Sequence, residues 1–434
     1  MQRKRIMVRS LILMVAISTW DVCLAESTSV DLFTAFESAV NKTETIPIQV
    51  KITDQAKELA DQAFGAVLPK VVGTFSDLQQ QIPTGIQGSI AASAFPSNEL
   101  TTQLNITQPV FQGLKEYANI RSANENVKYN ELLTDQAKIT LFQTVALAYF
   151  NVLAAEKDKE DLIESLNQNL ARVAELREWY RIGRARIGDV QLEESTIATL
   201  RAQIEADNVA IAQARYQLAT ASGLDPQITL NKDPTKLPTK VRDLNAYLND
   251  LERRPDIASL RSQIKIANEG IIVARSGHLP TVSVFGDLYP ARSGELHDSF
   301  WDVGVTLSMP IYSGGIVVSQ VRQAAENVSV AELTLSQNIR TVQNTVRALH
   351  AAVTMGITET NAYIEAAKTA KDNYKTQVHD FKFGLVTNLD VITAMTTYLS
   401  TVQTLDKTFY QTIYAYAQLR SSAGKLPKDL GDEF

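Results

Sequence analysis

A block of the chain recurs after 201 residues, and this duplication constrains the fold more than any local pattern does. Residues 109–113 (PVFQG) return as residues 310–314 (PIYSG). The same spacing relates three further pairs: Gly183 and Gly384, Asp189 and Asp390, and Gly223 and Gly424. We therefore expect a first repeat over residues 26–224, a linker over 225–243 and a second repeat over 244–434. Each repeat is predicted to contain a helix, two strands and a long helical hairpin.

The N-terminus is typical of a secretory signal peptide. Four basic residues precede a short apolar run, and small residues precede Glu26, which predicts cleavage after Ala25 and a signal peptide over residues 1–25. The alternative is that Cys23 becomes a lipidated N-terminus. A lipid-attachment box has small apolar residues before the cysteine, whereas Trp20 and Asp21 precede this one. With cleavage after Ala25, the single cysteine of the chain is removed.

The charge and apolar content narrow the function classes. Net charge is −6, and removing residues 1–25, with four basic residues and one acid, leaves −9. An acidic chain of this kind is not expected to bind nucleic acid. After the signal peptide no run approaches 18 consecutive apolar residues, so we expect no membrane-spanning helix. Membrane insertion as a β-barrel remains open, because its strands give only a weak hydropathy signal.

Alternating residues over 301–309 predict a strand with one apolar face. The first half carries a weaker copy over 100–108, and a second strand is expected to begin near Leu279 and, in the first half, near Leu68. Strands of about 9 to 11 residues cross the hydrocarbon layer when tilted. The residues expected at the membrane boundary and against lipid are Phe300, Trp301, Val303, Val305 and Leu307.

The hundred or so residues after each Pro-x-aromatic-x-Gly turn predict two long helices folded back at a tip. Proline and internal glycine are almost absent from these stretches except near the middle, at residues 183–189 and 384–390. On the returning arms, apolar residues recur every seven positions from Val190 and from Val391, a spacing that predicts left-handed coiled coils. Four strands per chain cannot close a barrel, and open sheet edges in lipid leave backbone groups without partners. We therefore expect the chain to form an oligomer.

Several motifs in order resemble the TolC family of outer-membrane efflux proteins. These are the duplicated Pro-x-aromatic-x-Gly pentapeptide, the Arg-Pro-Asp run at 254–256, the segment 277–280 before a strand, and the paired Gly-x5-Asp-Val tips. The resemblance covers nearly the whole mature chain. It implies a mainly α-helical protein with a membrane β-barrel part, which as a homotrimer forms a 12-stranded β-barrel in outer-membrane lipid and a 12-helix α-barrel across the periplasm. It also implies an exit duct for proteins or small molecules, which works with a periplasmic adaptor and an ABC or proton-driven inner-membrane transporter, without a cofactor or metal.

By the same resemblance, Asp390 and Asp189 form a ring of carboxylates that narrows the periplasmic end. The alternative is that both residues cap the returning helices, and one residue can do both. Val386 and Thr393 stand where family members carry an arginine of the closed gate and a second acidic ring. Arg184 and Arg186 are candidate substitutes for that arginine, unless they are simply solvated.

The remaining candidates at the tips are aromatic residues and turns. Tyr180 and Phe381 are expected either to bridge adjacent hairpins or only to pack. The tip residues expected to contact the adaptor are Gly183, Gly188, Gly384 and Leu385. The four histidines lack metal-site spacing, and no catalytic motif is present, so we do not expect an enzyme. A periplasmic adaptor or a soluble coiled-coil scaffold is the competing interpretation.

Overall fold

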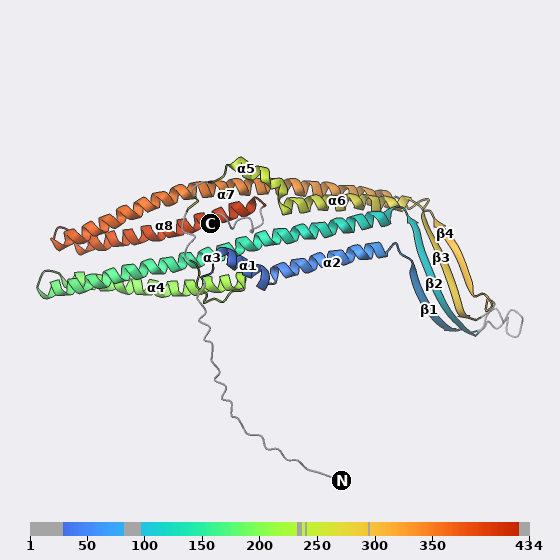
Figure 1. Ribbon diagram of the computed structural model, residues 1–434, viewed down its shortest axis with the longest axis horizontal. Coiled ribbons are helices and arrows are strands. Elements are labelled where there is room, and N and C mark those ends of the chain that lie inside the picture. Colours follow the sequence, from blue (N-terminus) through green and yellow to red (C-terminus); the bar gives the residue numbers. More distant parts are fainter. Residues whose placement is uncertain (1–28, 82–96, 232–236, 239–240, 294–295, 425–434) are drawn as a thin grey trace, which may run out of the picture.

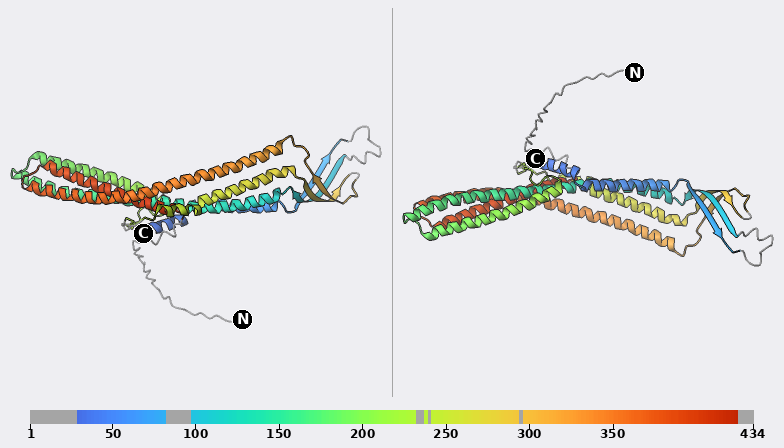
Figure 2. Two further views of the ribbon diagram at one scale, coloured as in Figure 1. Left: turned by 90° about the horizontal axis from the view of Figure 1, so that it is seen from above. Right: turned by 90° about the horizontal axis from the view of Figure 1, so that it is seen from below.

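The computed structural model describes residues 29–81, 97–231, 237–238, 241–293 and 296–424. The expected signal peptide and most of the loop between the first two strands lie outside these residues. The described chain is a long rod, with a small sheet at one end and two hairpin tips at the other (Figure 1). Figure 2 shows the same arrangement from two further sides.

The two halves repeat the same order of elements. The first half comprises α1 (Leu32–Lys42), α2 (Thr45–Gly65), β1 (Lys70–Gln79), β2 (Asn98–Gln112), α3 (Lys115–Arg181) and α4 (Ile187–Ser222). The second comprises α5 (Leu244–Asp250), the 3-10 turn η2 (Leu251–Arg253), α6 (Pro255–Arg275), the 3-10 turn η3 (Ser276–His278), β3 (Thr281–Arg292), β4 (Trp301–Ser308), α7 (Ile316–Lys382) and α8 (Asn388–Ser422). At 1.5 Å per residue, α3 and α7 are each about 100 Å long.

The four strands form one antiparallel sheet in the order β1-β2-β3-β4, so the strands of the two halves are joined where β2 pairs with β3. The prediction that alternate residues from 301 onward form one apolar face is confirmed. Residues 301, 303, 305 and 307 share one face of β4, and their apolar side chains are exposed in the single chain. The opposite face carries polar residues, including Asp287, whose carboxylate accepts hydrogen bonds from Gln103 and Asn105 at 2.8 and 2.7 Å.

The two Pro-x-aromatic-x-Gly segments differ in structure, and the expected turn is wrong for the first half. There β2 continues through Pro109 to Gln112, with a register shift between Pro109 and Phe111 where it pairs with β3. In the second half, β4 ends at Ser308. The physical reason is the register along β3, which begins at Thr281 and pairs there with Gln112 of β2 on one side and with Ser308 of β4 on the other. The first pentapeptide therefore still lies opposite β3, whereas Pro310 lies beyond its start. A bulge is where a proline is tolerated inside a sheet.

The main core lies midway along the rod, where α1, α3, α4 and α8 meet around Phe142, Tyr149 and Ile413. One described helix, α3, is long and apolar enough to cross a membrane by length and composition, although the sequence analysis expected none. In that stretch 56% of the residues are buried inside the chain. A helix that contacts α1, α2, α4, α6 and α8 needs apolar residues on several faces, and this explains its composition.

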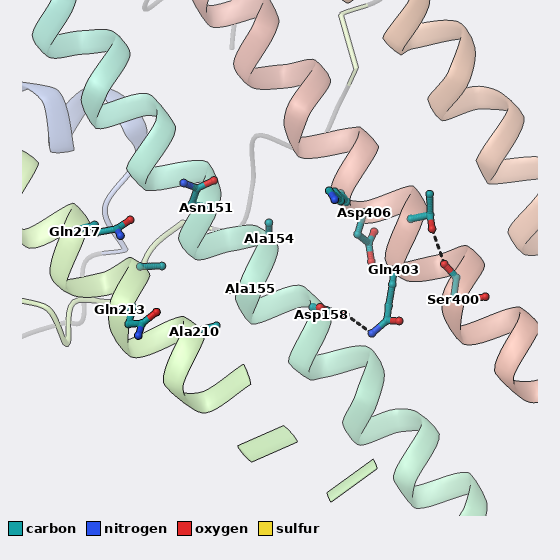
Figure 3. Close-up of a pocket in the computed structure, with 13 residues that line it drawn as sticks. Asn151, Ala154, Ala155, Asp158, Ala210, Gln213, Gln217, Ser400, Gln403 and Asp406 are labelled. Atoms are coloured by element: carbon teal, nitrogen blue, oxygen red, sulfur yellow. Dashed lines mark hydrogen bonds between the residues drawn. The ribbon is translucent and has the colours of Figure 1, made fainter. Parts of the chain in front are cut away.

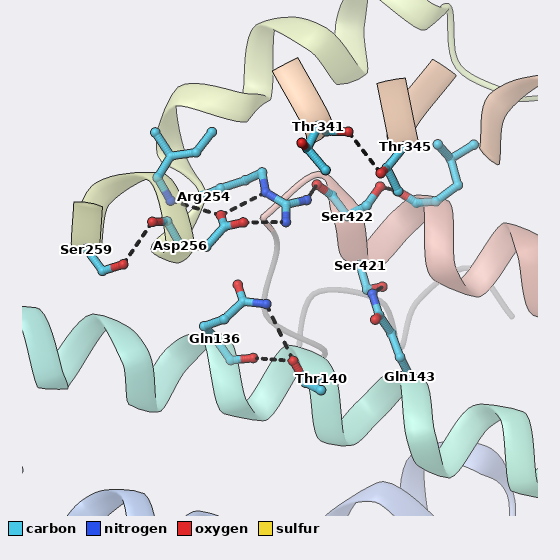
Figure 4. Close-up of polar contacts among 12 residues, drawn as sticks. Gln136, Thr140, Gln143, Arg254, Asp256, Ser259, Thr341, Thr345, Ser421 and Ser422 are labelled. Carbon is cyan, nitrogen blue, oxygen red and sulfur yellow. Dashed lines mark hydrogen bonds and ion pairs between the residues drawn. The ribbon is translucent and has the colours of Figure 1, made fainter. Parts of the chain in front are cut away.

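Residues near the start of the second repeat form hydrogen bonds with the C-terminal end of its last helix, α8 (Figure 4). Arg254 donates two hydrogen bonds to the Asp256 carboxylate, both at 2.9 Å, and a third to the Ser422 carbonyl oxygen at the C-terminus of α8. Nearby, Gln143 of α3 donates to the Ser421 hydroxyl at 2.8 Å. A cation at the last carbonyls of a helix is favourable. The Arg-Pro-Asp motif therefore joins the start of the second repeat to the C-terminal end of its last helix.

Candidate functional site

Each hairpin tip is a short turn that begins with a glycine in the left-handed region. The backbone φ is +77° at Gly183 and +73° at Gly384, conformations that side chains rarely adopt. The next backbone N–H groups fold back on the ends of the first helices, where Arg184 donates to Trp179 at 2.7 Å and Leu385 donates to Asp380 at 3.1 Å. The two repeats therefore build the same turn.

Asp189 and Asp390 occupy the third position of the returning helices. The Asp390 carboxylate accepts from the Thr387 backbone N–H at 2.8 Å and from its hydroxyl at 2.6 Å. The Asp189 carboxylate accepts from the Arg186 backbone N–H at 3.1 Å. Both residues thus act in capping, from the third helical position rather than from the N-cap itself. The two Thr387 hydrogen bonds hold the pKa of the Asp390 carboxyl below its usual range.

The other tip candidates are mostly exposed. Arg184, Arg186, Gly188, Leu385 and Thr393 face solvent in the single chain, and Val386 is half-buried. Neither arginine forms an ion pair within the described part of the chain.

The two aromatic candidates have different surroundings within the chain. Phe381 stacks on Trp179 of the other hairpin, with ring centroids 5.4 Å apart, while Tyr180 is 49% exposed. Trp179 and Phe381 lie against a small core of Val173, Leu176, Val190 and Ile197. This core lies just inside the tips. Phe381 therefore packs against the other hairpin of the same chain, through Trp179.

A buried polar cluster that sequence reasoning missed joins the two tips. Arg172 of α3 donates to the Asn388 side-chain oxygen, from Nε at 3.1 Å and from Nη2 at 2.8 Å. Arg172 Nε lies 3.5 Å from Glu193 Oε2, and the Asn388 amide donates to the Asp189 carbonyl oxygen at 3.1 Å. We call Arg172, Glu193 and Asn388 the tip clamp. It ties α8 of the second hairpin to both helices of the first.

The tip clamp lies in a low-dielectric environment. Glu193 is fully buried and Arg172 is 8% exposed, with its guanidinium 4.7 Å from the Phe381 ring centroid. Burial raises the pKa of Glu193, and the Arg172 charge opposes this. Burial also lowers the pKa of Arg172. One signal in the sequence was available, because Glu193 lies midway in the heptad between Val190 and Ile197, where an apolar residue is expected.

Among the described residues, no group of three His, Cys, Asp or Glu side chains is placed to hold a metal ion. The site is made of carboxylates at two turns, a buried clamp behind them, and an exposed apolar sheet face at the far end of the rod.

Comparison with known proteins identifies the class. Residues 27–224 and 247–425 match the family of outer membrane efflux proteins, and the chain belongs to this family. It is 28% identical over 400 residues to the outer membrane protein TolC of Escherichia coli K12, covering 86% of this chain and 78% of TolC. The alkaline protease secretion protein AprF of Pseudomonas aeruginosa is 26% identical over 181 residues, covering 41% of this chain and 38% of AprF.

Solved structures share the fold. The outer membrane protein VceC of Vibrio cholerae superposes with a TM-score of 0.79 at 18% identity, covering 91% of this chain and 96% of VceC. The chain is therefore an exit duct of the outer membrane with a periplasmic helical tunnel, and it is neither an enzyme nor a soluble scaffold. Proteins of this class work with periplasmic adaptors and inner-membrane transporters.

Proposed function

We propose that three copies of this chain assemble into one duct, with twelve strands closed as a barrel in outer-membrane lipid. The observation that carries the proposal is the sheet, whose outer strands β1 and β4 have neighbours on one side only. Every residue of β1 is exposed in the single chain, and so are the side chains of Ile311 and Tyr312 beyond β4. Within lipid each open edge would leave unpaired backbone groups, at several kcal/mol each. Pairing β4 with β1 of the next copy removes both edges.

The same assembly would place the hairpins in a ring of twelve helices. Apolar side chains on α7 that no part of the single chain covers, such as Leu333 and Met355, both 70% exposed, would then face a neighbouring copy. Trp301 and Phe300, at the start of β4, would lie at the membrane boundary. The strand residues 303, 305 and 307 would face lipid.

At the opposite end, Asp189 and Asp390 of three chains would give six carboxylates near one constriction. Their capping bonds support this placement, because they fix both carboxylates on the first turn of a helix at the tip. In a ring these charges would repel and raise one another's pKa, against the lowering that Thr387 exerts within one chain. Such a ring would hold a divalent cation.

The closed state of this duct would rely on the tip clamp in place of an arginine at Val386. The clamp joins the two hairpins of one chain, so opening one hairpin away from the other must separate Arg172 from Asn388. Arg184 and Arg186 are exposed and form no ion pair within the described part of their own chain, so they would be available to the next copy. The exposed turns at 183–188 and 384–385 form the end of the rod, which makes them the proposed contact for a periplasmic adaptor.

The mass of the detergent-extracted particle, corrected for bound detergent, tests the assembly. Three chains per particle are expected. A monomer that stays in solution without detergent would refute the twelve-stranded duct.

Conductance tests the ring separately. Asp390→Ala is expected to remove the response of single-channel conductance to divalent cations, because it removes half of the carboxylates. Glu178→Ala is the matched control, since Glu178 is exposed in the last turn of α3 and pairs with Arg181 of the same helix. An unchanged cation response in Asp390→Ala would rule out the ring and leave the trimer proposal intact.

A further inference from the structure

Midway along the hairpins, a groove of about 640 Å³ lies between α3, α4 and α8, and its lining includes the acidic residues Asp158 and Asp406 (Figure 3). Asp158 and Asp161 lie on α3, and Asp406 lies on α8. The Gln403 amide of α8 donates to the Asp158 carboxylate at 2.6 Å, which fixes the relative position of the two helices here. This level of the rod is distant in sequence from both tips and plays no part in the gate described above.

Asp161 is 7% exposed, and only one of its carboxylate oxygens has a donor. Oδ1 accepts from Lys157 Nζ at 2.9 Å. Oδ2 of Asp161 and Oδ2 of Asp406 are both buried, and neither accepts a hydrogen bond from any donor group of the described chain. The two carboxyl groups are nevertheless within hydrogen-bonding reach of each other. Two carboxyl groups in contact, each with a buried oxygen that no donor reaches, lack a hydrogen atom between them.

One proton would satisfy both oxygens. A carboxyl that donates to a carboxylate makes a short, charge-assisted hydrogen bond, whereas two carboxylates at this separation repel. Burial raises the pKa of Asp406 to about 7, and the hydrogen bond and charge of Asp161 add to this effect. The charge of Asp158 acts in the same direction, and that of Lys157 opposes it.

Other charged groups surround the pair, including Lys407 beside Asp406 on α8 and Glu160, which pairs with Lys157 on α3. On α4, Asp207 interacts with Asp158 and Lys159, and Arg215 pairs with Glu156. On the other side of α8, Gly356 of α7 lies directly against Thr412. Tyr410, one turn beyond Asp406, is uncharged near neutral pH, since burial raises its pKa further above its usual value.

We propose that Asp161 and Asp406 form a proton-binding site that joins the two hairpins, occupied at acidic pH and empty at alkaline pH. The site goes beyond the duct function, because it makes the contact between the hairpins depend on protonation. A raised pKa means that the bound proton stabilises the packed hairpins fully at low pH, and that this stabilisation is lost as pH rises through about 7. Above that pH, repulsion between the two carboxylates loosens the α3–α8 contact at mid-tunnel.

Infrared spectroscopy of the full-length protein in detergent tests the site, since a protonated carboxyl has its own C=O stretching band. As pH is raised from about 5 to about 9, the wild-type band is expected to lose the intensity of one carboxyl per chain, centred near neutral pH. Asp406→Asn should lack this transition, because its amide donates permanently to Asp161. Asp135→Asn should keep it, since Asp135 is a half-buried residue of α3 that pairs with Lys138 and not with another carboxyl group.

Thermal unfolding gives the second readout. The wild-type midpoint is expected to fall by several degrees between pH 6 and pH 8, and that of Asp406→Asn to stay level. Asp161→Asn replaces the other half of the pair and should also remove the carboxyl transition, which keeps the test decisive if one variant fails to fold. A neutral-pH transition that survives in either Asn variant, or that is absent from the wild type, overturns the proposal.

Discussion

Helices α3 and α7 have the same length and the same place in their repeats, yet the chain surrounds them very differently. From Asn130 to Leu176, α3 buries side chains on several faces, because it lies between α1, α2, α4, α6 and α8. α7 lies at the edge of the helical layer and leaves Val330, Leu333 and Met355 exposed. The two copies of the repeat therefore have different surroundings within one chain. The central helix α3 is part of the core, whereas α7, at the edge, has an apolar surface suited to a neighbouring chain.

The largest effect that would test this difference is expected in the core of α3. Phe142→Ala should lower the free energy of unfolding by about 4 kcal/mol, because a 2% exposed ring that packs edge-on against Phe36 leaves a cavity. Leu333→Ala on α7 is the matched change at a position that is exposed in the single chain, and it should alter the urea midpoint of the dissociated monomer little. The measurement is urea unfolding followed by circular dichroism. Equal losses in both variants would contradict the assignment of α3 as core and α7 as edge.

The tip clamp is expected to give the next largest effect. Arg172→Ala should destabilise the hairpin tips by about 3 kcal/mol, because it leaves Glu193 buried without its ion-pair partner. Arg177→Ala removes an exposed pair with Glu194 and should cost less than about 1 kcal/mol. Amide hydrogen exchange at the start of α8 measures both. A clamp variant that exchanges no faster than Arg177→Ala would show that packing around Phe381 alone holds the tips together.

A smaller effect is expected at the N-terminal caps of α4 and α8, which differ in their hydrogen-bond donors. Thr387→Ala should destabilise the second tip by about 1 kcal/mol, because the Asp390 carboxylate loses the hydroxyl donor. The first tip has Arg186 at the same position and uses only backbone donors. Arg186→Ala should therefore leave the first tip almost unchanged. Amide hydrogen exchange in the first turns of α4 and α8 measures the effect of each variant. An equal acceleration of exchange in both variants would contradict the proposed difference between the two caps.

The smallest effect is expected when the pH is lowered until the Asp390 carboxylate becomes protonated. The lowered pKa of Asp390 means that its capping bonds stabilise the second tip at any pH above the ordinary carboxyl range and are lost as pH falls below it. Exchange of the Thr387 amide, corrected for its intrinsic rate, should accelerate only under those acidic conditions. Asp390→Asn should abolish this acid dependence. Acceleration already near neutral pH would mean that neighbouring carboxylates raise this pKa in the assembled protein.

The architecture was largely predictable from the sequence, because its signals are local or periodic. The spacing between repeats, the alternation over residues 301–309 and the glycines at 183 and 384 each constrain the backbone directly. The tip clamp was not predictable in the same way. The heptad defines which stripe of a helix is buried but not which helix covers it, and Arg172 and Asn388 are 216 residues apart. The acid pair of Asp161 and Asp406 was missed for the same reason.

The junction of the two halves within one sheet also determines when the sheet can form. The β1–β2 hairpin is complete once the first repeat has left the secretion machinery, but Leu100 pairs with Ser293, 193 residues later in the chain. Until that segment arrives, β2 presents an open edge and an apolar face, the features that favour aggregation. The emerging first half is therefore at its most prone to aggregation during the interval before the second half follows.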